Sequence, residues 1–522
     1  MLTCLGQFTS SNLPIVIINT NGQVILDDPK ISADLGIISN TTGGRNLVTD
    51  AWNHYSGKVG IEIRGQSSQQ FPMKSYSIEL QKADGSSNNK SLFGLPVESD
   101  WVLYAPYNDK TLMHNFLAYT ISREMGDWAA NCRYVELLVN GEYKGIYVFM
   151  EKIKRKAGRV NISSISNTDT SGDALTGGYI ISIDKEADGW FSNYKAGNGN
   201  VQFSYVYPKI DKINNQQKAY IKNYTDSFEY SLHSNSFQDK NTGWRRFADE
   251  KTFIDYFIVN ELSHNVDAYR LSSYFYKDRN TIDGKLKAGP VWDYDLAFRN
   301  ANYCDGSNTN GWAYKFNSVC PGDFWQVPAW WDILLSDTAF RSNLYCRWKE
   351  LRQTSLSTDR LTFLIDSVAA LTSEARERHF AQWPVLGQYI WPNPLPIPTS
   401  YEGEISLLKN WLGQRLAWLD DNIQRTGICA GYPENEEPSF MINSLENPIF
   451  ANTHLIIQSR ESQSLTMVII DMNGRKVGEY YLDVYQGVSS YALPAFKWPI
   501  GIYALQLFNK KGEKLTRKFL KK

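Results

Sequence analysis

The sequence has few cysteines, and they show no pattern typical of a metal site. Six cysteines occur among 522 residues, and none forms a Cys-x-x-Cys pair or a zinc-binding spacing, so no cysteine metal site is expected. Cys304 and Cys320 enclose a loop rich in asparagine, glycine and serine. Either a disulfide, which would suit an exported protein, or two free thiols is compatible with this spacing.

Long apolar runs and an excess of charge are also missing. No stretch reaches the roughly 18 apolar residues that a transmembrane helix needs. The 54 Lys+Arg and 55 Asp+Glu residues give a formal net charge of -1, so the charge supports neither nucleic-acid nor membrane-surface binding. The start MLTCLGQF lacks a basic segment followed by an apolar one, so we expect an export signal to be either absent or already removed.

What the chain does contain is enough apolar material for several folded domains. Its length predicts two or three domains of about 100 to 200 residues each. The apolar content is 42% and the aromatic content 14%. We interpret the aromatic residues mainly as core, although exported and carbohydrate-handling proteins are often rich in them too.

The first part of the sequence favours β-structure. Alternating or turn-separated apolar stretches occupy residues 13–25, 58–81 and 133–153. The turn pairs Asn21-Gly22 and Asn140-Gly141 are typical of hairpins. We therefore expect a β-rich lobe over residues 1–155, interrupted by a helix that Asp109 caps and that ends near Gly126.

Past residue 160 the spacing of apolar residues becomes helical. Apolar residues recur three and four apart in residues 251–265, 358–380 and 402–424. This pattern predicts a mainly helical lobe over residues 156–430. The fold class that results is α+β, with a β-rich lobe followed by a helical one.

The C-terminal part differs from both lobes. Residues 431–440 form an acidic, proline-containing linker, and short alternating strands follow it. Turn pairs occur at Asn473-Gly474 and Lys511-Gly512. We expect a separate small β-sandwich over residues 441–522.

The first candidate cluster for chemistry lies between two predicted strands. Arg64, Ser67 and Ser68 surround a flexible connection, and Lys74 follows on the next strand. Such a connection can present backbone N–H groups to phosphates, which a lysine reaches as a point charge. A Gly/Ser hairpin with a surface lysine is the simpler alternative.

The second cluster contains an acid between a helix and a strand. Asp267 lies where a loop between rigid neighbours can orient a hydroxyl and accept its proton. His264 and Arg270 are close in sequence. Local capping is the preferred interpretation of His264, and a salt bridge is the alternative role for Arg270.

The third cluster is the acid pair in GPVWDYDLAF. Asp293 and Asp295 lie between apolar stretches, where a buried charge without a partner costs several kcal/mol. GKLKAGPVWDYDLAF is interpreted as the return strand of a β-hairpin with Asp293 at its end, so both acids should face one side, because strand side chains repeat every second residue. Oxygen ligands of this kind suit Mg²⁺, Mn²⁺ or Ca²⁺, and two hydrogen-bonded structural aspartates are the alternative.

The order of these clusters is informative. A β lobe with a phosphate-type loop and a lysine precedes a helical lobe with an acid and then a metal-type acid pair. This is the layout of kinase-like phosphotransferases, so the sequence favours ATP chemistry.

Several stretches in this order resemble the CotH (spore-coat protein H) kinase family, which has an atypical protein-kinase-like fold. They lie between about residues 13 and 300 and include IEIRGQSSQQFPMKSYSIEL, VELLVNGEYKGIYVFMEKIKR, GGYIISIDK, NELSHNVDAYRLSSYFYKD and GKLKAGPVWDYDLAF. The helical continuation to about residue 425 is similar as well.

The resemblance implies roles for individual residues. Asp267 would be catalytic, and Asp293 with Asp295 would bind Mg²⁺ or Mn²⁺. The residues implied for ATP are Arg64, Ser67, Ser68 and Lys74, with Glu151 and Lys152 near the strand that links the lobes. Two departures stand out: Ser272 replaces the usual kinase asparagine, and Asp-Tyr-Asp replaces Asp-Phe-Gly. Either Asp295 substitutes for that asparagine or nucleotide binding is weak.

The tail has its own resemblance. IIDMNGRKV, PIGIYALQL and the terminal KLTRKFLKK are similar to the C-terminal sorting domain of type IX secretion in Gram-negative bacteria. An ordinary immunoglobulin-like module is the alternative. The resemblance implies contact with the type IX secretion machinery and a location at the cell surface or outside the cell.

The leading hypothesis is a kinase that uses ATP and Mg²⁺ to phosphorylate Ser or Thr of a secreted or surface protein. A catalytically silent kinase-like module for surface assembly or binding is the second hypothesis. A metal-dependent phosphoester hydrolase is the third, because two acids and a cation also suit that reaction.

Overall fold

The structure is a computed structural model, and the chain forms two compact units, residues 1–427 and 428–522. The described residues are 8–40, 44–185, 188–197, 199–424, 429, 439–445, 448–450, 453–471, 476–510 and 513–521. The predicted linker at 431–440 falls mostly outside them, as do the turn pairs Asn473-Gly474 and Lys511-Gly512. Each unit is described by itself.

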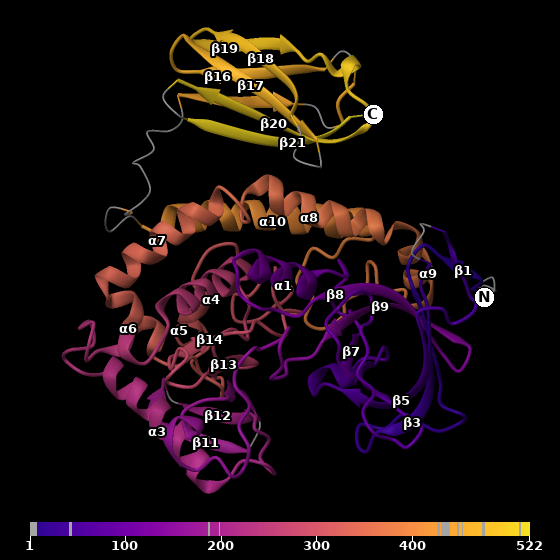
Figure 1. The fold of residues 1–522 in the computed structure, drawn as a ribbon, viewed down its shortest axis with the longest axis vertical. Coiled ribbons are helices and arrows are strands. Elements are labelled where there is room, and N and C mark those ends of the chain that lie inside the picture. The colour runs from indigo at the N-terminus through magenta and orange to yellow at the C-terminus, as the bar shows by residue number, and fades with distance from the viewer. Residues whose placement is uncertain are drawn as a thin grey trace. The chain divides into compact units, whose positions relative to one another are not determined.

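Seven strands of the first unit close into a barrel in the order β2-β3-β5-β6-β7-β9-β8 (Figure 1). Their bounds are β2 Ile15–Asn19, β3 Ile31–Ile38, β5 Tyr55–Arg64, β6 Ser75–Gln81, β7 Asp100–Tyr104, β8 Cys132–Val139 and β9 Glu142–Glu151. Neighbouring strands are antiparallel except β2 and β8, whose parallel pairing closes the barrel. The interior is filled by side chains such as Leu35, Ile61 and Trp101, all fully buried.

Turn chemistry explains part of this topology. The hairpin of β8 and β9 turns at Asn140-Gly141, where both residues have positive φ, 52° and 80°, as a two-residue hairpin turn requires. This prediction is confirmed. The prediction of two strands over residues 13–25 is only half right, because β2 forms but the next long strand begins at Ile31.

Shorter elements complete the barrel side. They are β1 Ser10–Ser11, which pairs with β4 Asn46–Leu47, the 3-10 helix η1 Ser67–Gln70 and the helix α1 His114–Glu124. Asp109 does not occupy the cap position expected for it, since Met113 is the N-cap. Its carboxylate nevertheless accepts the N–H of His114 at 2.8 Å, which satisfies a free donor of the first turn.

The second half of the unit has more helix than strand, as predicted, but it also includes a sheet that the apolar spacing did not indicate. It contains a five-stranded antiparallel sheet in the order β11-β12-β10-β13-β14. The strands are β10 Tyr179–Ile183, β11 Gly189–Ala196, β12 Gly199–Tyr207, β13 Ser273–Lys277 and β14 Leu286–Ala288. Every residue of β10 is buried, so this strand shows no apolar–polar alternation by which it could be recognised.

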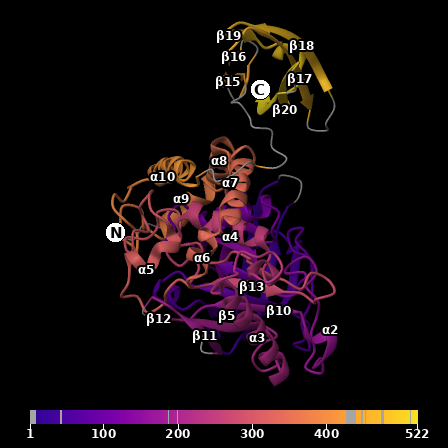
Figure 2. The same cartoon turned by 90° about the vertical axis from the view of Figure 1, so that its left-hand side faces the viewer.

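Helices surround this sheet. They are α2 Gly172–Leu175, α3 Asn215–Leu232, η2 Trp244–Arg246, α4 Glu250–Ser263, η3 Ala313–Lys315, α5 Phe316–Val319, α6 Trp330–Ser336, α7 Thr338–Arg352, α8 Thr358–Leu371, α9 Ser373–Gln382 and α10 Tyr401–Asn422. The helices predicted over 251–265 and 402–424 are confirmed as α4 and α10. The stretch 358–380 forms two helices, α8 and α9, instead of one. Helix α3 lies beside β11 (Figure 2), and α8 lies beside α10 (Figure 1).

Helix α9 joins the helical part to the barrel. The N–H of Ile146 in β9 donates to His379 Nδ1 at 3.1 Å, and Arg378 pairs with the buried Glu136 at 2.6 Å. Gly145 has φ +100°, and a Cβ there would stand 2.8 Å from His379 Nδ1. Only glycine fits such an approach without strain, so this contact holds the barrel against the helices.

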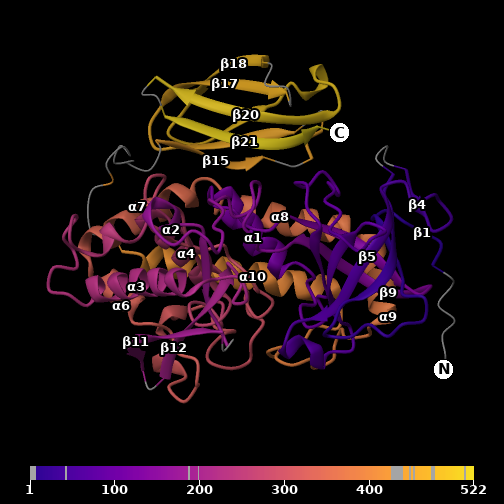
Figure 3. The same cartoon turned by 60° about the horizontal axis from the view of Figure 1, so that its bottom comes forward.

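The second unit consists of two antiparallel sheets (Figure 3), β15-β16-β19 and β18-β17-β20-β21. The elements are β15 Phe440–Leu445, β16 His454–Ser459, β17 Gln463–Asp471, β18 Lys476–Val484, β19 Gly487–Ala492, η4 Ala495–Lys497, β20 Gly501–Asn509 and β21 Lys514–Lys521. Residues of both sheets share one hydrophobic cluster that includes Ile457, Ile469 and Leu505.

Three cysteine findings bear on the sequence analysis. Cys304 and Cys320 form a disulfide, which decides between the two alternatives. Cys346 and Cys429 are disulfide-bonded as well, and Cys132 is a buried free thiol. These disulfides fit an extracellular protein. In the part of the chain that the structure describes, none of the helices has the length and apolarity needed to cross a bilayer.

Candidate functional site

A cleft of about 320 Å³ opens between the barrel and the second half of the first unit. Barrel residues Arg64, Ser67, Ser68, Tyr104 and Met150 line one side. The other side contains Asp184, Asp267, Ser272, Trp292, Asp293 and Asp295. The structure therefore brings the catalytic and metal candidates of the sequence analysis to the same cleft as three of its nucleotide candidates.

The segment that carries the acid pair is a turn and not a strand. Strand β14 ends at Ala288, and Asp293 has a left-handed φ of 65°, so the argument from strand alternation was wrong. Helix α1 holds this turn: Tyr119 accepts the N–H of Asp293 at 3.1 Å, and Asn115 accepts that of Tyr294 at 2.7 Å. Non-glycine residues adopt this backbone conformation at a cost of about 1–3 kcal/mol, which the surrounding structure must offset.

Asp293 and Asp295 face one another across this turn. Asn108 donates its Nδ2 to Asp295 Oδ2 at 3.3 Å, and Asn300 Nδ2 donates to the Asp295 carbonyl at 2.7 Å. The Asp293 side chain is exposed within the cleft, but the surrounding protein still removes part of its solvation. This desolvation, followed by the charge of Asp295, raises the pKa of Asp293, and desolvation also raises the pKa of Asp295.

Asp267 lies in the loop between α4 and β13, as expected from the sequence. Arg270 Nη2 donates to its Oδ1 at 2.8 Å, and its own N–H donates to Asn265 Oδ1 at 3.1 Å. Arg270 also contacts Asp323 at 3.3 Å and is nearly fully buried, so Asp267 is held by a fixed cation. The salt bridge proposed as the alternative role for Arg270 is thus present.

His264 belongs to the frame of this loop. It is the C-cap of α4 with a φ of 45°, and its Nδ1 donates to the Asn308 carbonyl at 2.9 Å. Burial lowers the pKa of His264 to about 3. The local capping interpretation agrees with this position.

The barrel side presents unused donors to the cleft. The guanidinium of Arg64 lies 5.6 Å from the ring centre of Trp292. Its Nη1 and the hydroxyl of Tyr104 are buried and have no hydrogen-bond partner among the described residues. Buried donors without partners are rare in folded proteins and indicate a missing ligand or water.

The connection after Arg64 depends on a glycine. Gly65 has φ +95°, and a Cβ there would stand 2.1 Å from Ser68 Oγ. Because Gly65 has no side chain, η1 can fold back tightly against it, which brings Ser67 and Ser68 to the cleft.

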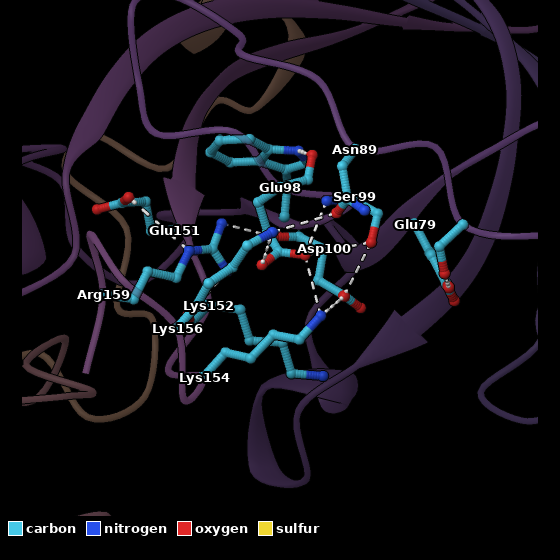
Figure 4. Close-up of polar contacts among 12 residues, drawn as sticks. Glu79, Asn89, Glu98, Ser99, Asp100, Glu151, Lys152, Lys154, Lys156 and Arg159 are labelled. Atoms are coloured by element: carbon cyan, nitrogen blue, oxygen red, sulfur yellow. Dashed lines mark hydrogen bonds and ion pairs between the residues drawn. The ribbon is translucent and has the colours of Figure 1, made fainter. Parts of the chain in front are cut away.

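Three predicted nucleotide residues do not line the cleft. Lys74 Nζ donates to the Gln69 carbonyl at 2.5 Å, within the turn that carries Ser67 and Ser68. Glu151 is fully buried and accepts two hydrogen bonds from Asn131, at 2.9 and 2.8 Å. Lys152 follows β9 together with Lys154 and Lys156 (Figure 4), and burial lowers its pKa.

Sequence reasoning missed other residues of the cleft. Asp184 follows β10, and Asn108, Tyr104 and Trp391 come from three further segments. An acid directly after an apolar stretch was a usable signal, since YIISI-Asp184 repeats the pattern that drew attention to Asp293. No local pattern marks Asn108 or Trp391.

The fit of a divalent cation depends on the donor set. The described residues contain no group of three or more His, Cys, Asp or Glu side chains arranged to hold a metal ion. Mg²⁺ usually binds through one or two carboxylates and completes its shell with water and phosphate oxygens. Asp293 and Asp295, two crowded carboxylates with raised pKa values, fit this mode of binding.

The fold and the cleft define a mixed α+β protein with an acidic site beside a barrel. The family model described as CotH kinase protein matches residues 61–419, more than half of the 522 residues. The chain therefore belongs to the CotH kinase family, and a kinase-like function with use of ATP and a divalent metal follows in general terms. A search of curated proteins finds no match. The second unit lies beyond the matched residues.

Proposed function

We propose that this protein is an ATP- and Mg²⁺-dependent (or Mn²⁺-dependent) kinase that transfers the γ-phosphate to Ser or Thr of a surface or secreted protein. The observation that carries the proposal is that Asp267, Asp293 and Asp295 line one cleft. Family membership supports it. Phosphoryl transfer requires an acid, ligands for a cation and hydrogen-bond donors for phosphate oxygens, and the cleft residues can supply all three.

Each part of the cleft has a role in this proposal. Asp267, oriented by Arg270, accepts the proton of the acceptor hydroxyl. Arg64 Nη1 and the Tyr104 hydroxyl donate to phosphate oxygens, and the turn with Ser67 and Ser68 covers them. A divalent cation held by Asp293 and Asp295 would neutralise the phosphate charge.

Lys74, Glu151 and Lys152 take indirect roles. Lys74 positions the Ser67–Ser68 turn through the Gln69 carbonyl. Glu151 anchors the end of β9 to Asn131, and Lys152 adds positive charge where the barrel joins the rest of the unit. All three would affect nucleotide affinity through the shape and charge of the cleft.

The domain organisation belongs to the same proposal. Residues 1–155 would be the nucleotide-binding lobe of a kinase-like two-lobed fold, and residues 156–430 the catalytic lobe. After a linker at 431–440, residues 441–522 would be an immunoglobulin-like sorting domain recognised by the type IX secretion machinery. The protein would then act at the cell surface or outside a Gram-negative bacterium, in keeping with its disulfides.

A catalytically silent kinase-like binding module is the second candidate. Two observations favour it: Lys74 is engaged by Gln69 instead of facing the cleft, and Ser272 stands where kinases carry a metal-binding asparagine. Such a module would bind nucleotide weakly or not at all.

Titration of the full chain with a non-hydrolysable ATP analogue and Mg²⁺ separates these candidates. We expect saturable binding that Asp293→Asn abolishes and that the exposed control Asp211→Asn leaves unchanged. Radiolabelled transfer from ATP to a surface extract should be lost in Asp267→Asn, which retains binding. Absence of binding supports the silent module, and phosphate release from phosphoesters without nucleotide supports a hydrolase.

A further inference from the structure

Ser272 occupies a special position beside the cleft. It stands five residues after Asp267, where a typical kinase has an asparagine that binds a metal ion. Its φ is 45°, in the left-handed region that serine rarely adopts. The surrounding structure must therefore stabilise this backbone conformation of Ser272, and the contacts of its side chain indicate its function.

The strained serine holds a carboxylate from another strand. Ser272 Oγ donates to Asp184 Oδ2 at 3.5 Å, the outer limit of a hydrogen bond, and its backbone N–H donates to Asp184 as well. The N–H of Lys185 donates to Asp184 Oδ1 at 2.8 Å. Donors from two segments thus orient the Asp184 side chain.

Strand pairing explains why the two residues meet. Strands β10 and β13 are antiparallel, and Ile183 pairs with Ser273. Asp184 and Ser272 come next in this register, so they lie opposite each other at the end of the sheet. Both line the cleft that contains Asp293.

Asp184 faces the negative charge of Asp293, and the adjacent Lys185 is the cation whose charge acts on it. Among the described residues no Lys, Arg or His forms an ion pair with it, and Asp293 is one of the charges that act on it. Arg64 Nη1 and the Tyr104 hydroxyl, both buried without a hydrogen-bond partner, line the same cleft. Carboxylates on one wall and unused donors on the other are complementary to a phosphate group with its cations.

We propose that Asp184 takes the role of the missing kinase asparagine and ligates a second divalent cation, which binds together with the nucleoside triphosphate. This inference rests on the proposed function. Asp184 follows β10, a different segment from the turn that carries Asp293 and Asp295, and we therefore assign it to a separate cation in the same cleft. Ser272 is a positioning residue, because it acts through Asp184.

The number of bound cations tests this inference independently of activity. Electron paramagnetic resonance of the full chain with Mn²⁺ and a non-hydrolysable ATP analogue should show two bound ions. Asp184→Ala should bind one, with affinity for the second reduced at least about tenfold, while the exposed control Asp211→Ala should bind two. Ser272→Ala should lower the affinity for the second ion less than replacement of Asp184 does, because the backbone donors to Asp184 remain.

A rescue variant gives a second measurement. Asparagine tolerates left-handed backbone well, so Ser272→Asn should fold without added strain. In the Asp184→Ala background, Ser272→Asn would restore the amide oxygen of a typical kinase, and the second Mn²⁺ should return. A purely structural role for Asp184 predicts no such return. Melting temperatures would show that all variants are folded.

The outcomes distinguish this inference from the proposed function. If the unaltered chain binds no Mn²⁺ with the analogue, both are overturned. If it binds one ion, or if Asp184→Ala binds two ions with unchanged affinity, only the role of Asp184 is overturned. Loss of the second ion in Asp184→Ala, together with its return when Ser272→Asn is added to that variant, supports the inference.

Discussion

Two sets of carboxylates in the first unit have opposite electrostatic environments. Glu98 is 1% exposed and accepts from Lys154 at 2.9 Å and from the Ser99 N–H at 2.8 Å (Figure 4). Lys156 lies 3.1 Å from its other oxygen. In the cleft, Asp293 and Asp295 have each other as close charged neighbours.

The pKa values follow from these surroundings. Desolvation raises the pKa of Glu98, but the hydrogen bonds from Lys154 and the Ser99 N–H outweigh it and leave the pKa at about 2. For Asp293, desolvation and the neighbouring Asp295 act in the same direction and raise the pKa. Lysines of the chain offset the charge of Glu98, whereas the charge of Arg64 offsets that of Asp293 only in part.

Asp293→Asn should have the largest effect, because it removes half of the proposed cation site. We expect phosphotransfer to fall at least about 100-fold, the range typical of lost electrostatic stabilisation. The metal-free variant should melt at a higher temperature than the unaltered chain, because one of two repelling charges is gone. Calorimetry with and without Mg²⁺ measures this, and a lower metal-free melting temperature would contradict the proposed repulsion.

Glu98→Gln should act in the opposite direction on stability. Lys156 loses its ion pair with Glu98 and Lys154 keeps only Asp100 as a carboxylate partner, which costs about 1–3 kcal/mol. The melting temperature of the first unit should therefore fall. Lys156→Gln is the matched control and should cost less, because Lys154 still pairs with Glu98. Equal effects of the two variants would show that Glu98 is not the centre of the network.

The pH dependence of stability should also differ between the two sets. Because the folded pKa of Asp293 lies above its ordinary value of 3.8, the stability it contributes is present at low pH and is lost as pH rises. The pKa of Glu98 is lowered from 4.5 to about 2, so its contribution is lost as pH falls through that window.

Comparison of variants isolates these contributions. Burial also raises the pKa of Glu229 and of Glu404 to about 7, so the unaltered chain alone is not informative. The melting-temperature gain of Asp293→Asn over the unaltered chain should grow between pH 5 and pH 8. Mg²⁺ should stabilise the unaltered chain more at pH 8 than at pH 6, since it competes with protons. If the melting-temperature gain of Asp293→Asn did not change with pH, repulsion between ionised Asp293 and Asp295 would be excluded as its cause.

The smallest effect is expected for Lys74. Arg64 faces the cleft, so Arg64→Met should weaken binding of the ATP analogue about tenfold, or about 1.4 kcal/mol. Lys74→Met removes only the hydrogen bond to Gln69 and should change the dissociation constant less than about threefold. Isothermal titration of both variants measures the difference. A larger loss of affinity in Lys74→Met than in Arg64→Met would indicate that Lys74 binds phosphate directly.

Local patterns predicted the elements in which sequence neighbours cooperate. The Asn140-Gly141 hairpin, helix α4 and the loop position of Asp267 follow from turn residues and apolar spacing, and the structure has them. The barrel was read only as separate strands. Its closure depends on the parallel pairing of β2 with β8, which joins residues more than 100 positions apart and leaves no local signal.

Site residues were predictable to different degrees for the same reason. An acid between apolar stretches marked Asp293 and Asp295, although a left-handed turn and not a strand presents them. The position of Lys74 next to a Gly/Ser connection indicated phosphate binding, but nothing local shows that its Nζ reaches the Gln69 carbonyl. Asp184 enters the cleft only because β10 pairs with β13.

The sequence by itself determined the family, the turn and helix signals, and the residue types that a phosphate-handling site needs. Only the tertiary structure decided which charges are compensated, since Glu98 meets its lysines and Asp293 meets Asp295 through contacts between distant segments. Electrostatic energy depends on distance and burial in space, and the order of residues along the chain contains neither quantity.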